Sequence, residues 1–198
     1  MRLHRVSAVT AAAALALAAG AGPALAHTGL PGHEHAGFWA GLMHPVSGMD
    51  HLLAMLSVGI WSALATDGDR RRVWLAPFAF VSAMLVGAMA GYGGVPLPLV
   101  ETGIAASVVA LGLMIAARVQ LPVLVGSALV AVFAIYHGHA HGSEAVGSIV
   151  GYMAGFALTT ATLHVAGIAA GLGLMRLRLV SGLLGAGIAA AGVYLLAS

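Results

Sequence analysis

Long apolar runs recur along the whole chain, and they constrain its fold more than any other feature. About six stretches of roughly 20 residues follow one another, which is the length needed to cross a bilayer. The runs are continuous and lack the alternation of membrane β-strands. Only 7% of the residues are charged, whereas a soluble domain carries about 25%. We therefore predict an all-α fold, a polytopic helical bundle embedded in a membrane.

Turn-forming and charged segments divide these runs into expected transmembrane helices. The divisions are TDGDRRR, GYGGVPLP, the residues around Arg118, HGHAHGSEA and RLR. We expect about six spans, at residues 38–65, 73–92, 99–117, 121–138, 146–174 and 179–197.

The N-terminal segment has the pattern of a signal peptide over residues 1–26. Arg2 and Arg5 precede an Ala/Leu-rich stretch, and a small-residue site ends at Ala26. We expect cleavage after Ala26, with a retained first helix as the alternative. Cleavage would leave one six-helix transmembrane domain over residues 27–198, opening with a histidine-rich outer segment at 27–37.

Arginine placement predicts the orientation of the bundle. With alternating spans, six arginines fall on one side of the membrane: Arg70, Arg71, Arg72, Arg118, Arg176 and Arg178. The positive-inside rule makes that side cytoplasmic. A cleaved signal peptide agrees, because it places the new N-terminus outside. We therefore expect a multi-pass protein of the bacterial inner membrane, with both mature termini in the periplasm.

Histidines outnumber acidic residues, ten to six, and the chain has no cysteine. Without thiolates, disulfides and thiolate metal sites are excluded. The histidines lie on the outer side or within the spans, and this gradient predicts a metal path. Our candidate ligands are His44, Asp50, His51, Glu101, His137, His139, His141, Glu144 and His164, with outer capture by His27, His33 and His35.

Asp50 and His51 are the most informative of these residues, because they lie near the middle of the first span. A charged aspartate at this depth costs about 2.5–3.5 kcal/mol on insertion scales, so a compensating partner or ion is expected. Imidazole with carboxylate suits Ni²⁺, Co²⁺ or Zn²⁺. His44 would lie roughly 10 Å from His51 along an unbroken helix. Either a break near Pro45 and Gly48 brings them together, or they serve successive positions.

Other patterns have simpler explanations beside the functional one. His164 alone fits a hydrogen bond between helices as well as a metal ligand. Met55, one turn beyond His51, is an additional soft ligand or an ordinary core residue. Glycines at four-residue intervals predict close helix packing, at Gly147, Gly151, Gly155, Gly167 and Gly171.

Two motifs, HPVSGMDH and YHGHAHGSE, resemble those of the HupE/UreJ family. The resemblance covers nearly the whole mature chain, and it implies uptake of nickel or cobalt. It gives first-motif roles to His44, Asp50 and His51. It gives second-motif roles to three other residues, which are His137, His141 and Glu144. Glu101 matches in the third span, Tyr136 replaces the usual phenylalanine, and His139 occupies a variable position.

The expected function is a secondary permease that imports Ni²⁺ or Co²⁺, with Zn²⁺ left open. We expect no enzymatic activity, no tightly bound cofactor and no nucleic-acid partner; the partners are the metal ion and the lipid bilayer, and a homo-oligomer stays open. One alternative is a membrane cytochrome with His51 and His164 as axial ligands of a b-type haem. Another is a metal-binding accessory or sensor protein that transports nothing.

Overall fold

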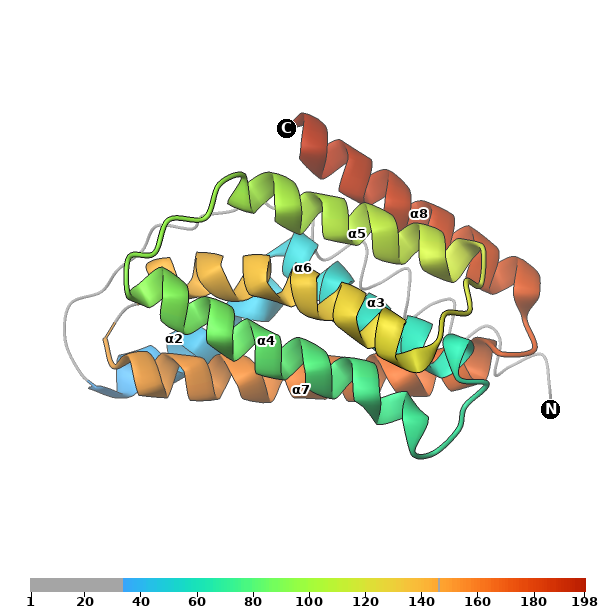
Figure 1. The fold of residues 1–198 in the computed structure, drawn as a ribbon, viewed down its shortest axis with the longest axis horizontal. Helices are drawn as coiled ribbons and strands as arrows, with labels where there is room; N and C mark the ends of the chain where they lie inside the picture. Colours follow the sequence, from blue (N-terminus) through green and yellow to red (C-terminus); the bar gives the residue numbers. More distant parts are fainter. Residues whose placement is uncertain (1–33, 146) are drawn as a thin grey trace.

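The computed structural model describes residues 34–145 and 147–198, and every regular element in this part of the chain is a helix. The elements are α2 (Glu34–Ser47), α3 (Met49–Ala65), the short 3₁₀ helix η1 (Arg72–Trp74), α4 (Leu75–Tyr92), α5 (Val100–Ala116), α6 (Val123–Ser143), α7 (Ile149–Leu174) and α8 (Arg178–Ala197). The prediction of an all-α fold is confirmed (Figure 1).

The chain is a multi-pass membrane protein. Four helices are long and apolar enough to cross a bilayer: α4 with its leading 3₁₀ turn, α6, α7 and α8. Helices α2 and α3 form a fifth candidate only if taken together. Helix α5 has 17 residues and falls just short. By length and composition, the described residues thus hold four or five spans instead of six, because the first span is broken and the third is short.

The first expected span, residues 38–65, consists of two helices that meet at an angle of 78°. Pro45 lies inside α2, where it removes a backbone donor. Gly48 then has an extended backbone, with φ −97° and ψ 124°, and α3 starts directly after it. Helix α2 also begins at Glu34, so the histidine-rich segment expected over residues 27–37 ends in helix.

Helices pack in pairs: α4 on α6, α5 on α8, and both α2 and α3 on α7 (Figure 1). Glycines allow the backbones to approach closely. A Cβ at Gly155 would collide with Phe38 O of α2, and one at Gly167 would collide with Leu56 O of α3. Gly171 packs in the same way against Ile60 of α3, so the predicted close packing is confirmed at these three glycines.

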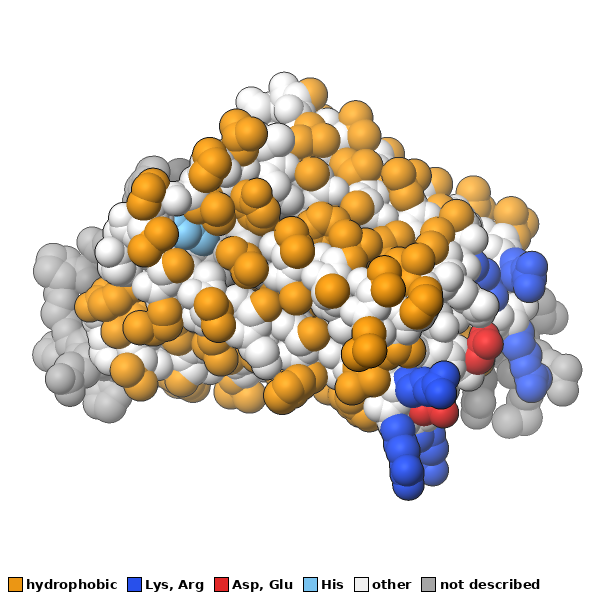
Figure 2. Space-filling model, viewed as in Figure 1, with side chains coloured by type: hydrophobic (Ala, Val, Ile, Leu, Met, Phe, Trp, Pro, Cys, Tyr) orange, Lys and Arg blue, Asp and Glu red, His pale blue; other side chains and the backbone are white. Residues whose placement is uncertain are grey.

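The two ends of the bundle differ in charge. The arginine-bearing segments join α3 to α4, α5 to α6, and α7 to α8. Figure 2 shows the visible arginine side chains gathered at one end, while hydrophobic side chains cover the flank. The predicted one-sided distribution of arginine is therefore confirmed. The predicted signal peptide, residues 1–26, lies outside the described residues, and so do His27 and His33.

Candidate metal centre

Four histidine rings from three helices gather at the end of the bundle opposite the arginines. His44 comes from α2, His51 from α3, and His137 and His141 from α6. The ring centroids of His51 and His141 are 4.3 Å apart, those of His44 and His141 4.5 Å, and those of His51 and His137 4.9 Å. We call these four residues the histidine cluster.

The break between α2 and α3 is what makes His44 and His51 neighbours. Their ring centroids are 5.8 Å apart, well below the roughly 10 Å expected along a continuous helix. Of the two arrangements that the sequence left open, the structure has the broken helix. Gly48 also leaves room for the site, because a Cβ there would lie 2.7 Å from Asp50 Oδ1 and 3.1 Å from His51 Nδ1.

Asp50 determines which nitrogen of His51 carries the proton. Its Oδ1 lies 2.6 Å from His51 Nδ1 and accepts the backbone N–H of His51 at 2.8 Å. Because a carboxylate only accepts hydrogen bonds, Nδ1 donates. In the neutral ring, Nε2 then has a free lone pair. That atom is buried and has no hydrogen-bond partner among the described residues.

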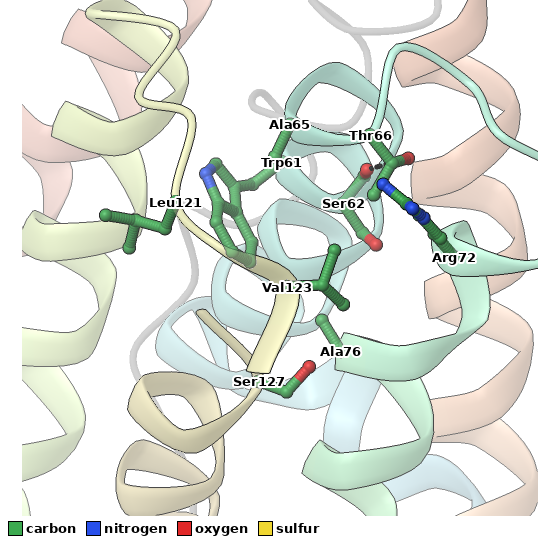
Figure 3. Close-up of a pocket in the computed structure, with 9 residues that line it drawn as sticks. All are labelled: Trp61, Ser62, Ala65, Thr66, Arg72, Ala76, Leu121, Val123 and Ser127. Atoms are coloured by element: carbon green, nitrogen blue, oxygen red, sulfur yellow. Dashed lines mark hydrogen bonds between the residues drawn. The ribbon is translucent and has the colours of Figure 1, made fainter. Parts of the chain in front are cut away.

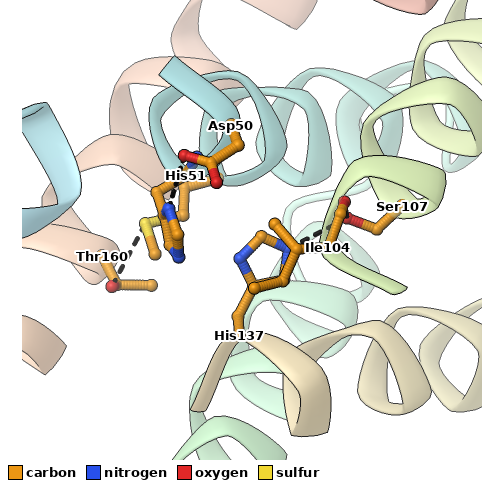
Figure 4. A network of polar contacts seen from close by, with 7 residues as sticks. Asp50, His51, Ile104, Ser107, His137 and Thr160 are labelled. Carbon is orange, nitrogen blue, oxygen red and sulfur yellow. Dashed lines mark hydrogen bonds and ion pairs between the residues drawn. The ribbon is translucent and has the colours of Figure 1, made fainter. Parts of the chain in front are cut away.

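Ser107 of α5 determines which nitrogen of His137 carries the proton. The Ser107 hydroxyl donates to Ile104 O at 2.6 Å, so it accepts from His137 Nε2 at 2.9 Å. The lone pair of His137 therefore lies on Nδ1, which is also buried and unpartnered among the described residues. Figure 4 shows the His51 and His137 rings next to one another, with Asp50 beside His51 and Ser107 beside His137.

His141 is the least satisfied member of the cluster. Its ring is fully buried and lies 3.9 Å from that of Phe156, centroid to centroid. Neither ring nitrogen has a hydrogen-bond partner in the part of the chain that the structure describes. Leaving buried polar atoms unpaired costs about 1–3 kcal/mol each, so such groups call for a functional explanation. The cluster is thus a set of inward-facing lone pairs suited to a cation.

A second grouping lies at the outer edge of the cluster. Donor atoms of His44, His141 and Glu144 all fall within 4.8 Å of one another, which a single metal ion could bridge. Glu144 is exposed at the end of α6, whereas His141 is buried. The three residues therefore connect the surface to the cluster.

Sequence reasoning missed Tyr152, which lies in the first turns of α7. Its ring centroid is 6.2 Å from that of His44. Its hydroxyl is buried and has no hydrogen-bond partner within the described segments. Ser107 was missed as well. Both residues lie on apolar helix faces, and no signal in the sequence distinguishes them from core residues.

The structure places three other candidates outside the cluster. His139 lies on another face of α6, where its Nε2 donates to Val95 O at 2.7 Å. Glu101 is exposed in the first turn of α5. His164 lies farther along α7, 5.2 Å from Phe80 between ring centroids. The backbone of a fourth candidate, His35, lies in the first turn of α2.

The level between His51 and His164 is filled by protein. Met55, Met84 and Thr160 are all fully buried there. His164 Nδ1 is engaged by Met55 O at 2.8 Å. These side chains and the bond from His164 to the Met55 carbonyl count against the haem alternative.

A small hollow lies at the arginine end, separate from the cluster. It measures about 10 Å³, room for about one water molecule. Its lining comes from α3, η1, the start of α4, the start of α6 and the turns beside them. Figure 3 shows these residues: Trp61, Ser62, Ala65, Thr66, Arg72, Ala76, Leu121, Val123 and Ser127. Ser127 Oγ has no hydrogen-bond partner among the described residues.

The chain is similar over most of its length to a known protein family and to a known relative. Residues 14–195 match a family described as "HupE / UreJ protein". The chain is 42% identical over 193 residues to Protein HupE of Rhizobium leguminosarum bv. viciae, and the alignment covers 94% of this chain and 95% of that protein. No solved structure matches the chain.

Proposed function

The chain belongs to the HupE/UreJ family, whose members are linked to nickel uptake and are not enzymes, and from this premise we propose that it is a secondary permease importing Ni²⁺ or Co²⁺. The observation that carries the proposal is the convergence of unpartnered ring nitrogens in the histidine cluster. Zn²⁺ is the alternative cargo.

The donor set favours a borderline divalent ion. Neutral imidazoles with few carboxylates suit Ni²⁺, Co²⁺ and Zn²⁺, whereas Ca²⁺ and Mg²⁺ require more oxygen ligands. Asp50 holds His51 by a 2.6 Å contact, so its negative charge acts on the ion chiefly through the ring. Such an arrangement binds an ion without the tight hold of a thiolate cage, and transport also requires release.

The path runs from the outer grouping into the cluster. His44, His141 and Glu144 would take the hydrated ion from the periplasm, with Glu101 and the N-terminal histidines raising its local concentration. His51 and His137 would then replace the remaining water ligands. This direction assumes that the arginine end is cytoplasmic, as the positive-inside rule predicts. It also assumes cleavage after Ala26, which leaves the N-terminus in the periplasm.

The test is uptake of radioactive Ni²⁺ by cells or membrane vesicles. We expect Asp50→Asn and His51→Ala to lower the initial rate by at least about tenfold, the lower end of what perturbing a metal site costs. His139→Gln is the matched control, because this histidine faces Val95 and not the cluster. Undiminished uptake in both cluster variants would refute the site. Ni²⁺ binding without flux in the wild type would favour an accessory or sensor protein.

A further inference from the structure

One helical turn below the histidine cluster, three helices meet through two thioether sulfurs and one hydroxyl. Thr160 Oγ1 of α7 lies 3.3 Å from Met55 Sδ of α3 and 3.8 Å from Met84 Sδ of α4. All three side chains are fully buried. The two sulfurs therefore converge on a single point inside the bundle.

The orientation of the Thr160 hydroxyl differs from that of a neighbouring threonine. Thr162, on the same helix, donates to Leu158 O at 2.8 Å, four residues back, as helical threonines commonly do. Thr160 instead directs its hydroxyl at the two sulfurs, which are weak acceptors. Its single proton lies toward these sulfurs, with Met55 Sδ the nearer acceptor.

His164 adds a nitrogen atom that could bind a metal, one turn farther along α7. Its Nδ1 lies 2.8 Å from Met55 O, and because a carbonyl only accepts, Nδ1 carries the proton. Its Nε2 therefore presents a lone pair. The side chain is 2% exposed, and Nε2 has no hydrogen-bond partner among the described residues. His51, His137 and His141 of the histidine cluster likewise have a buried ring nitrogen without a hydrogen-bond partner among the described residues.

These groups continue the line of the cluster toward the arginine end. On α3, Met55 follows His51 by four residues, about 6 Å along the axis. On α7, Thr160 and His164 follow Phe156, whose ring lies 3.9 Å from that of His141. An ion leaving the cluster inward would meet this level next.

We propose that Met55, Met84, Thr160 and His164 form a second, deeper metal-binding station that receives the ion from the histidine cluster; this rests on the proposed permease function. Thioether and imidazole donors accept borderline and soft transition ions and discriminate against Mg²⁺ and Ca²⁺. The station contains no carboxylate, so it binds a divalent cation more weakly than the cluster beside Asp50. A fall in affinity along the path favours release.

The first test replaces both sulfurs, in the double variant Met55→Leu/Met84→Leu. Leucine nearly conserves the volume of methionine, so the core should remain packed. We expect Ni²⁺ uptake to fall about tenfold, with thermal stability in detergent retained. Met114→Leu is the matched control, since Met114 is a buried methionine on α5. Uptake by the double variant at the wild-type rate would overturn the station.

Three further variants test the other ligand atoms. His164→Asn keeps an N–H donor near Met55 O but removes the Nε2 lone pair, and we expect severalfold slower uptake. Thr160→Val conserves shape and removes the hydroxyl, whereas Thr162→Val makes the same change on an exposed site. A loss of uptake for Thr160→Val that equalled the loss for Thr162→Val would count against the station.

A binding measurement separates failure of the station from failure of the permease hypothesis. Ag⁺, which prefers thioethers, would be titrated into purified His51→Ala/His141→Ala protein, with and without the double leucine change. We expect one fewer Ag⁺ bound per chain when both sulfurs are removed. Equal binding would overturn the station even if the wild type transports Ni²⁺. Absence of Ni²⁺ flux in the wild type, with the Ag⁺ difference intact, would refute only the permease.

Discussion

Arg118, half-buried at the charged end of the bundle, and the histidine cluster at the opposite end are two polar regions that differ in how fully their hydrogen bonds are made. Arg118 donates through Nε to Ser181 Oγ at 2.9 Å, and through its two terminal nitrogens to Met175 O and Leu174 O at 2.7 and 2.6 Å. It thereby ties α5 to the α7–α8 junction.

The histidine cluster leaves the corresponding atoms unpaired. His51, His137 and His141 each retain at least one buried ring nitrogen without a partner among the described residues. Polar groups that only support a fold are normally satisfied within it. We therefore expect the arginine to support the fold and the cluster to bind a ligand, and the following experiments test that difference.

The largest expected effect on transport comes from His141→Leu. Removing this proposed ligand of the histidine cluster should lower Ni²⁺ uptake by about 100-fold. The melting temperature should stay the same or rise, because an apolar side chain replaces two unpaired buried nitrogens. Uptake and thermal unfolding would be measured on the same preparation. A variant that unfolds while its remaining folded fraction transports normally would reverse our assignment.

Arg118→Met should show the opposite pattern. It removes three donors and leaves the carbonyls of Leu174 and Met175 unpaired, so we expect a loss of about 2 kcal/mol of stability. Uptake per folded molecule should remain close to that of the wild type. Arg176→Met is the control, because Arg176 lies at the same junction and does not make these three hydrogen bonds. A stable but inactive Arg118→Met protein would contradict a structural role.

Ser107→Ala tests whether the tautomer of His137 matters. Without the hydroxyl that accepts from Nε2, the proton is free to move to Nδ1, where the lone pair faces the cluster. We expect about a tenfold loss in metal affinity, as for other residues that orient a ligand ring. Isothermal titration with Co²⁺ would measure it, and ¹⁵N spectra of the histidine ring would report the tautomer. Unchanged affinity together with a changed tautomer would refute the argument.

Gly48→Ala should have a smaller effect, because it crowds the cluster without removing a ligand. The new Cβ would lie 2.7 Å from Asp50 Oδ1, so the carboxylate must shift, and we expect about a fivefold slower uptake. Gly173→Ala is the control, since a Cβ there meets nothing within 4 Å. Equal rates for the two variants would show that Gly48 leaves no functionally important space.

The smallest effect concerns Asp69, at the arginine end and outside the spans. Backbone N–H groups of Arg72 and Arg71 donate to its carboxylate and hold its pKa below the usual value. A lowered pKa means that this carboxylate stabilises the turn at neutral pH and loses that contribution as the pH falls through the folded-state pKa. Asp69→Asn should slightly weaken the acid dependence of the melting temperature, below about pH 4. An identical pH profile would show that the hydrogen bonds to Asp69 do not contribute to the stability of the protein.

Much of the architecture could be predicted from the sequence. Apolar run length predicted helices, and the arginine positions predicted one charged end, because both depend on local composition. The spacing of the second motif could also have predicted which of its histidines share a helix face. His137 and His141 are four residues apart and share a helix face, whereas His139, two residues away, must point elsewhere. Its contact with Val95 follows from that geometry.

Other features depended on contacts that no local pattern records. Pro45 and Gly48 made a break plausible, but no local pattern gives the 78° angle between α2 and α3, which both pack against α7. The shortfall of α5 was missed because its apolar run extends into flanking turns. Ser107 and Tyr152 look like ordinary residues of apolar faces until neighbouring helices place His137 and His44 against them.

The sequence by itself determined that the chain must be helical and membrane-embedded, since backbone groups in lipid have to be satisfied within each segment. It also determined which residue types were available to bind a metal. Only the tertiary structure decided which of them meet, because a site between helices depends on how each helix is rotated and bent against the others. Ring nitrogens far apart in the chain become one site through that packing alone.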